Sequence, residues 1–335
     1  MIILMKGQVF KIHSDFYYVN FDNKIYECKL REILKKQKSK ILTGDFVEFE
    51  NGAITKILPR SNFLTRPSVA NITQIVIVSA VKEPDLDFEQ LDRYICFAKY
   101  HNIKTKLCFN KNDLSQDDKI IEQVFSVYEP LGFDIIFTSA LEKIGTEDFK
   151  EILTNETTVF CGNSGVGKSS LINAIFPNLN LKTNEVSEKT HRGTHTTRHC
   201  EIFEKDNIRI IDTPGFSNLK FDFITPQTLT TLFDDINKYA KHCKFADCTH
   251  TKENGCEVLN NSDKIAPSRF QSYKSFFKES QEFKEKIKFE SKKKESSQKI
   301  SQNKNLAKIS IQKRQSSRNN LRQQIYKEIN NGEEE

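Results

Sequence analysis

A glycine-rich segment near the middle of the chain constrains the fold more than any other stretch. Within residues 157–174, the apolar run Val159–Cys161 leads into GNSGVGKS at 162–169 and then into apolar residues at helical spacing. Glycines let a backbone turn its N–H groups inward around phosphate oxygens, and the N-terminal end of the next helix attracts the same charge. The segment predicts a strand, a phosphate-binding loop and a helix. A glycine-rich turn without a ligand is the alternative, and the flanking strand and helix disfavour it.

Two side chains of this loop have the chemistry that a nucleoside triphosphate requires. We expect the Lys168 ammonium to reach the β- and γ-phosphates and the Ser169 hydroxyl to hold Mg²⁺.

The composition is that of a folded protein with a basic C-terminal tail. With 335 residues, 37% of them hydrophobic and 26 of them Phe, the chain has room for two or three domains with a real core. It contains no apolar run of membrane-spanning length, and the start at Met1–Lys6 is too short for a signal peptide, so we expect a cytoplasmic protein. From Arg269 to Glu335 there are 17 Lys and Arg against 9 Asp and Glu, which favours a polyanionic partner such as nucleic acid. A solvated charged helix is the alternative.

The first 66 residues predict a small β-barrel. Five short segments of alternating polarity, bounded by turn residues, lie at 8–12, 16–19, 24–28, 45–49 and 53–58. Five-stranded barrels of the OB type often bind nucleic acid on one face, and aromatic and basic residues suit that role. The candidates are Phe16, Tyr17, Tyr18, Lys35, Lys36 and Lys38. For any single aromatic residue, a place in the barrel core is the stronger alternative. Residues 59–68, rich in Pro, Arg and Ser, are predicted to form a linker.

A parallel sheet is predicted to follow, and its strand ends carry polar residues. Ile75–Val78 forms a continuous apolar run, and a helical pattern separates it from a second strand at 105–109. That strand ends on Asn110-Lys111-Asn112-Asp113, at the edge where α/β proteins bind ligands. An Asp carboxylate accepts two hydrogen bonds from guanine that adenine does not offer, the Lys stem covers the base, and the Asn braces the loop. Alone, this tetrapeptide is more often a surface turn; beside a phosphate loop it indicates guanine recognition.

Further polar segments complete a nucleotide site. A third strand ends on Ser139-Ala140, whose backbone N–H groups are expected to face the guanine carbonyl. The polar stretch 182–199 resembles a mobile sensing loop, in which Thr196 or Thr197 supplies a hydroxyl to Mg²⁺ when the γ-phosphate is present. Two strands later, Asp212 is expected to contact Mg²⁺ through water and the Gly215 N–H to touch the γ-phosphate, although Asp-Thr-Pro-Gly is also a common β-turn sequence.

The order of these parts is unusual. The base-reading Asn110–Asp113 precedes the phosphate loop, whereas ordinary Ras-like chains place it afterwards, so the domain is predicted to be circularly permuted. The loop that senses the γ-phosphate then runs directly into the next domain, and nucleotide state can bias that domain. Phe216 occupies the position where many GTPases carry a water-orienting Gln, which predicts slow intrinsic hydrolysis.

A second cluster predicts a metal centre. Cys243, Cys248, His250 and Cys256 supply three thiolates and one imidazole within fourteen residues, which suits a closed tetrahedral zinc site. Unrelated reduced cysteines are the alternative. Apolar residues at helical spacing precede and follow the cluster, and we expect both helices to pack around it.

Together these motifs resemble the RsgA (YjeQ/EngC) family of circularly permuted GTPases over about residues 1 to 280. The resemblance implies an α/β fold in which an OB-like β-barrel (1–66) precedes a circularly permuted P-loop GTPase domain (67–220), a helical zinc-binding domain (221–283) and a basic tail (284–335). It implies a protein that binds the 30S subunit and 16S rRNA, and whose Mg²⁺-dependent GTP hydrolysis the subunit stimulates late in maturation. The sequence gives no sign of oligomerisation, so we expect a monomer. The implied GTP-binding residues are Asn110, Lys111, Asp113, Ser139, Ala140, Gly162, Asn163, Ser164, Gly165, Val166, Gly167, Lys168, Ser169, Ser170 and Gly215.

The resemblance also assigns hydrolysis and metal roles. The family pattern Gly-x-His-Thr-Thr matches at Gly193–Thr197, which makes His195 the candidate for hydrolysis beside Lys168, with contact to RNA phosphate or plain solvation as alternatives. Mg²⁺ is assigned to Ser169, Thr196 and Asp212, and one structural zinc ion to Cys243, Cys248, His250 and Cys256. Two other functions stay open: an ATPase or nucleotide kinase with the same phosphate loop, and an RNA chaperone whose nucleotide site is only structural.

Overall fold

The computed structural model describes residues 4–36, 40–115, 118–179, 200–213, 219, 221 and 223–296. The chain up to Lys286 forms one compact unit, and a second begins at Ile287. Because this division separates only the tail, the predicted limits of the three N-terminal domains stay predictions. Most of the predicted tail lies outside the described residues. Across the described part of the chain, every helix is too short or too polar to cross a lipid bilayer.

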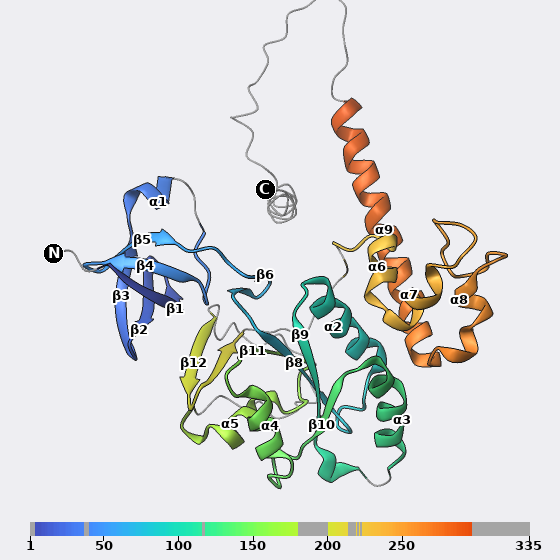
Figure 1. Cartoon of the computed structure of the whole chain (residues 1–335), viewed down its shortest axis with the longest axis horizontal. Coiled ribbons are helices and arrows are strands. Elements are labelled where there is room, and N and C mark those ends of the chain that lie inside the picture. The colour runs from blue at the N-terminus through green and yellow to red at the C-terminus, as the bar shows by residue number, and fades with distance from the viewer. Residues whose placement is uncertain are drawn as a thin grey trace, which may run out of the picture. The chain divides into compact units, whose positions relative to one another are not determined.

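The N-terminal strands close into a barrel, which confirms the predicted architecture (Figure 1). The first strand pairs with both the second and the fourth, and the third pairs with the fifth. Alternate side chains point inward, so Val9, Val19 and Val47 are fully buried. The elements are β1 (Met5–His13), β2 (Phe16–Phe21), β3 (Lys24–Leu30), α1 (Glu32–Lys36), β4 (Phe46–Glu50) and β5 (Ala53–Ile57).

The candidate nucleic-acid residues of the barrel separate into two groups. Tyr17 packs against the barrel core, as the alternative interpretation expected. Phe16 lies on the other side of β2, where the Lys29 ammonium sits 4.7 Å from the centre of its ring. Lys35 and Lys36 are exposed, and Lys38 lies outside the described residues. The outer face of β2 therefore retains an aromatic and basic character.

The predicted linker is not an extended connection, because it folds into a hairpin. Strands β6 (Phe63–Thr65) and β7 (Ser68–Ala70) pair with each other, and Leu64 and Val69 are fully buried against the next domain's core. The Pro and Arg residues around them disguised this short alternation in the sequence.

The next domain is an α/β sandwich around a mostly parallel sheet. Its strand order is β10-β9-β8-β11-β13-β12, in which β12 runs antiparallel to β13. Helices α2 and α3 cover one face and α4 and α5 the other, so β8 is buried on both faces, as its apolar run predicted. The elements are β8 (Gln74–Ala80), α2 (Phe88–Tyr100), β9 (Lys104–Asn110), α3 (Lys119–Tyr128), β10 (Asp134–Phe137), α4 (Thr146–Leu153), β11 (Thr157–Cys161), α5 (Lys168–Ile175), β12 (Glu201–Lys205) and β13 (Ile208–Asp212).

The barrel and this domain share one sheet. Strand β12 pairs with β1, where Lys11 lies opposite Glu201 and their side chains form an ion pair of 2.8 Å. The Thr43 hydroxyl also donates to the main-chain oxygen of Cys200 at 3.1 Å. The predicted sensing loop therefore ends on a strand that is bonded to the barrel.

The C-terminal helices have their own apolar core, formed by the apolar residues that precede and follow the cysteine cluster at helical spacing. Phe233 before the cluster, and Tyr273 and Phe276 after it, are fully buried in this core. The helices are α6 (Pro226–Leu232), α7 (Asp234–Ala240), α8 (Glu257–Asn260) and α9 (Pro267–Ser296). The first part of the predicted tail is thus helical.

Candidate functional site

The glycine-rich loop connects β11 to α5, in the strand-loop-helix arrangement that its sequence predicted. Two of its glycines are required by close contacts. Gly162 has φ +144°, and a Cβ there would lie 2.0 Å from the main-chain oxygen of Val78. Gly167 has φ +86°, and a Cβ would lie 2.3 Å from the side-chain nitrogen of Asn110. A residue with a Cβ at either position would require β8 or the Asn110 side chain at the end of β9 to move.

Lys168 folds over this loop from the first turn of α5. Its Nζ donates to the main-chain oxygens of Gly162 and Asn163, each at 2.7 Å. Burial lowers the pKa of the Lys168 ammonium. An anion within the loop would stabilise the charged form, since opposite charge offsets the loss of water.

Asn110 joins the three loops that the sequence assigned to one site. Its Nδ2 donates to the main-chain oxygen of Val166 in the glycine-rich loop, at 3.0 Å. Its Oδ1 accepts from the Ala140 N–H at 3.1 Å and from the Thr138 hydroxyl at 3.2 Å. Asn110 is 1% exposed, so water does not compete for these hydrogen bonds. The predicted bracing geometry of Asn110 is therefore present in the structure.

The rest of the base-reading segment follows Asn110 at the end of β9. Lys111 has left-handed backbone geometry (φ 62°), and its Nζ donates to the main-chain oxygen of Glu83. Asp113 lies in a short 3-10 helix, Asn112–Leu114, with its side chain partly exposed. Its selection of guanine stays a prediction.

The Ser139–Ala140 turn lies beside this segment but uses its own N–H groups. The Ser139 N–H donates to Ile144 O at 3.0 Å, and the Ala140 N–H donates to Asn110. In this conformation, the turn's predicted contact with the guanine carbonyl requires one of these bonds to be shared or released.

The predicted Mg²⁺ ligands lie partly within the described residues. Ser169 is in the first turn of α5, and Asp212 ends β13 beside the Glu201 end of β12. Burial, with the Glu201 charge adding to it, raises the pKa of the Asp212 carboxyl, and a nearby cation would reverse that effect. His195, Thr196 and Gly215 lie outside the described residues.

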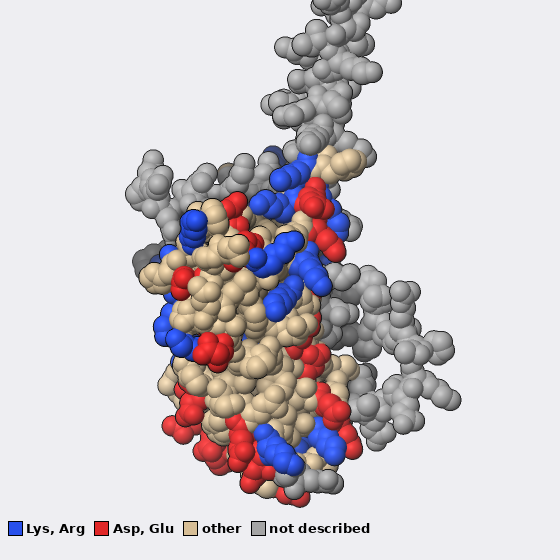
Figure 2. Space-filling view, turned by 90° about the vertical axis from the view of Figure 1, so that its right-hand side faces the viewer, with Lys and Arg blue, Asp and Glu red and all other residues tan. Residues whose placement is uncertain are grey.

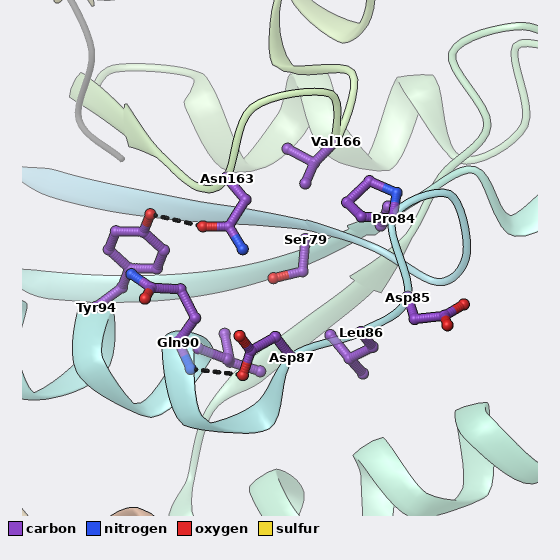
Figure 3. A pocket seen from close by; sticks show the side chains of 11 residues that line it. Ser79, Pro84, Asp85, Leu86, Asp87, Gln90, Tyr94, Asn163 and Val166 are labelled. Carbon is purple, nitrogen blue, oxygen red and sulfur yellow. Dashed lines mark hydrogen bonds between the residues drawn. The ribbon is translucent and has the colours of Figure 1, made fainter. Parts of the chain in front are cut away.

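Sequence reasoning did not predict a polar pocket that lies between the glycine-rich loop and the start of α2 (Figure 3). The β8–α2 connection and the start of α2 form one wall, and Asn163 and Val166 form the other. Across it, the Tyr94 hydroxyl donates to the Asn163 Oδ1 at 3.2 Å, and the carboxylate of Asp87 caps α2 by accepting from the Gln90 N–H. A buried Tyr at helical spacing gives no sequence signal that distinguishes this contact from ordinary packing.

The cysteine cluster assembles as its spacing predicted. The ligand atoms of Cys243, Cys248, His250 and Cys256 all lie within 4.8 Å of one another. The Nδ1 of His250 is 3.6 Å from the Cys243 sulfur and 3.4 Å from the Cys256 sulfur, and these two sulfurs are 3.9 Å apart. Tetrahedral zinc, with Zn–S bonds of about 2.3 Å, separates its ligand atoms by about 3.5–3.8 Å. Three thiols and an imidazole at this spacing therefore fit zinc.

A carboxylate that the sequence did not single out organises the turn around His250. Glu253 accepts from the N–H groups of Thr249, Thr251 and Lys252 at 2.9, 3.0 and 3.1 Å and also from the Thr249 hydroxyl. Burial opposes its charge, but these hydrogen bonds outweigh burial and lower the pKa of Glu253 to about 2. The turn holds His250 in left-handed geometry (φ 56°) with its side chain buried.

Comparison with known families finds matches over most of the described chain. A family described as RsgA GTPase matches residues 57–222, and one described as RsgA N-terminal domain matches residues 6–56.

Named relatives are similar over nearly their whole length. A protein of Alkaliphilus metalliredigens named small ribosomal subunit biogenesis GTPase RsgA is 40% identical over 286 residues, which cover 82% of this chain and 98% of that protein. A protein of the same name from a Geobacillus species is 39% identical over 288 residues, covering 83% and 98%.

Solved structures match as well. YjeQ from Thermotoga maritima has a TM-score of 0.72 and 33% identity, covering 83% of this chain and 99% of that one. YloQ, described as a circularly permuted GTPase, has a TM-score of 0.70 and 31% identity, covering 84% and 96%.

Proposed function

The chain belongs to the RsgA family of circularly permuted GTPases, and on that premise we propose that it binds the small ribosomal subunit and hydrolyses GTP in response to it during late subunit maturation. The bond network of Asn110 carries the nucleotide half of this proposal, because it assembles the base-reading and phosphate-binding loops into one site. The names of the relatives, which describe biogenesis of the small ribosomal subunit, support the ribosomal half.

The proposed roles follow from the sequence motifs, and those of Thr196, Gly215 and His195 rest on the sequence alone. Asp113 selects guanine, while the glycine-rich loop and Lys168 hold the phosphates. Ser169, Asp212 and Thr196 hold Mg²⁺, and the Gly215 N–H contacts the γ-phosphate. Hydrolysis by such a site depends on positioning and on offsetting charge at the γ-phosphoryl group as water attacks in line. His195 is proposed to act in this step.

Binding of ribosomal RNA is supported by charge. Figure 2 shows the face on which the C-terminal helices lie, where Lys and Arg are interspersed with Asp and Glu over the upper half and Asp and Glu predominate over the lower half. Exposed lysines of the helical region include Lys238, Lys241, Lys244, Lys252, Lys264 and Lys278. Positive charge of this kind binds RNA phosphates and makes affinity fall with salt.

A structural zinc ion is proposed for the cysteine cluster, with all four ligands from the protein. When bound, it would cross-link the loops around Cys243 and Cys256 without offering an open position for catalysis.

Co-sedimentation tests this proposal directly. With a non-hydrolysable GTP analogue at fixed salt, the protein is expected to pellet with 30S subunits and not with 50S subunits, and to bind more weakly with GDP. Lys168→Ala, which removes the phosphate-binding ammonium, is expected to lose this nucleotide dependence. Equal pelleting with both subunits would reduce the function to generic RNA affinity. If Lys168→Ala bound no nucleotide but still acted on the small subunit as fully as the unaltered protein, the RNA chaperone alternative would be favoured.

A further inference from the structure

The Tyr94 side chain of helix α2 contacts the phosphate-binding loop. Tyr94 is 1% exposed, and its hydroxyl reaches across the pocket of Figure 3 to the side chain of Asn163. The main-chain oxygen of the same Asn163 accepts from the Lys168 ammonium at 2.7 Å. One residue therefore connects Tyr94 to the lysine that is proposed to bind phosphate.

The opposite side of α2 is held by the C-terminal helices. Asp92, fully buried, accepts from Arg269 of α9 at 2.6 Å and from the Tyr128 hydroxyl at 3.0 Å. Its neighbour Arg93 forms two bonds to the Glu279 carboxylate, at 2.7 and 2.6 Å. Asp92 and Arg93 are thus the two residues just before Tyr94, which contacts the phosphate-binding loop.

Aromatic rings enclose these charges. The Arg93 guanidinium lies 4.9 Å from the ring centre of Phe221 and 4.4 Å from that of Phe276, and Arg269 lies 4.4 Å from Phe233. Breaking a buried ion pair leaves an uncompensated charge, so separation of α2 from α9 is strongly disfavoured. A displacement of α9 is therefore expected to move α2 with it.

We propose that Tyr94 is a positioning residue of the phosphate-binding loop: by holding Asn163, it makes the loop's geometry depend on α2, which α9 grips through Asp92 and Arg93. The proposal rests on the GTP site proposed above. Through these contacts, a partner that docks on the C-terminal helices would change the affinity of the loop for nucleotide.

The test begins with Tyr94→Phe, which removes the hydroxyl and keeps the ring. Loss of one buried hydrogen bond near the site is expected to weaken binding of fluorescent GTP and GDP analogues about three- to tenfold. Asn163→Ala is expected to weaken binding similarly, and the double variant no further, because both remove the same bond.

The matched control is Tyr273→Phe, whose hydroxyl lies 3.0 Å from that of Thr230, away from the loop. Its nucleotide affinity should match that of the unaltered protein.

A second double-mutant comparison, which combines Glu279→Gln with Tyr94→Phe, tests the connection to α9. Glu279→Gln is expected to weaken GTP binding about twofold or more in the unaltered protein and to have no effect in the Tyr94→Phe background. Additive losses, or an unchanged affinity in Tyr94→Phe, would overturn the proposal. Should Tyr94→Phe fail to fold, Asn163→Ala removes the bond from the loop side and takes its place. A failure of the GTP site itself would appear separately, as an unaltered base preference in Asp113→Asn.

Discussion

Among single residues, Asp113 is the one expected to read guanine. Asp113→Asn is expected to weaken GTP binding by about tenfold or more, because it exchanges one charged acceptor of two guanine hydrogen bonds for a neutral amide. Base choice should relax at the same time, so that xanthosine triphosphate, whose 2-oxygen accepts a hydrogen bond, competes better. Competition against labelled GTP measures both effects. A matched control is Asp118→Asn, just before α3.

An unchanged ranking of GTP, ATP and xanthosine triphosphate in Asp113→Asn would favour the alternative ATPase or nucleotide kinase.

Single residues also show where sequence reasoning succeeds and where it ends. Gly162, Gly167 and Lys168 were predictable because a phosphate loop requires particular residue types at fixed spacing. Tyr94 was not, since its role depends on α2 lying against the loop, and 69 residues separate it from Asn163. The same limit applies to Arg269, whose partner Asp92 lies 177 residues earlier.

Among the structural elements, the turn around His250 in the cysteine cluster is expected to depend on Glu253. Glu253→Gln turns an amide NH₂ toward backbone N–H donors, so zinc release to excess chelator should accelerate about tenfold or more. Release is followed with a colorimetric zinc indicator. Glu257→Gln serves as the control, because this carboxylate contacts Asn260 in α8 and not the turn around His250. Equal release rates in the two variants would show that Glu253 does not organise the loop.

The end of α2 provides a prediction about pH. His101 packs among Phe97, Tyr100 and Phe223, and burial lowers its pKa to about 4. The unfolded chain, with a His pKa near 6.5, binds this proton first, so stability falls as pH drops from about 6.5 toward 4. The loss of thermal stability between pH 7 and pH 5 should be smaller in His101→Phe than in the unaltered protein. An identical loss in both, with exposed His242→Gln as the control, would contradict this placement.

Elements were more predictable when they were regular. The barrel strands and β8 follow from alternation and from a continuous apolar run, which are local signals. The hairpin β6–β7 was missed because only three residues form each strand, and their burial depends on the neighbouring core. Tertiary contacts, not local propensity, decide such short segments.

In the molecule as a whole, the GTPase domain is bonded to the barrel and to the C-terminal helices. Strand β12 joins its sheet to the barrel through β1, and Asp92 of α2 accepts a hydrogen bond from Arg269 of α9. A change at the nucleotide therefore has a bonded path toward each neighbour. This arrangement suits a GTPase whose partner surface extends over more than one domain.

The small ribosomal subunit is proposed to activate this GTP site. The most direct test is steady-state GTP turnover by the purified protein, alone and with 30S subunits, 50S subunits or free ribosomal RNA, at fixed salt. Because the intrinsic site lacks a water-orienting Gln at Phe216, we predict slow turnover alone and stimulation of about tenfold or more by 30S subunits only. Turnover that 30S subunits leave unchanged, or that any RNA raises equally, would contradict the account.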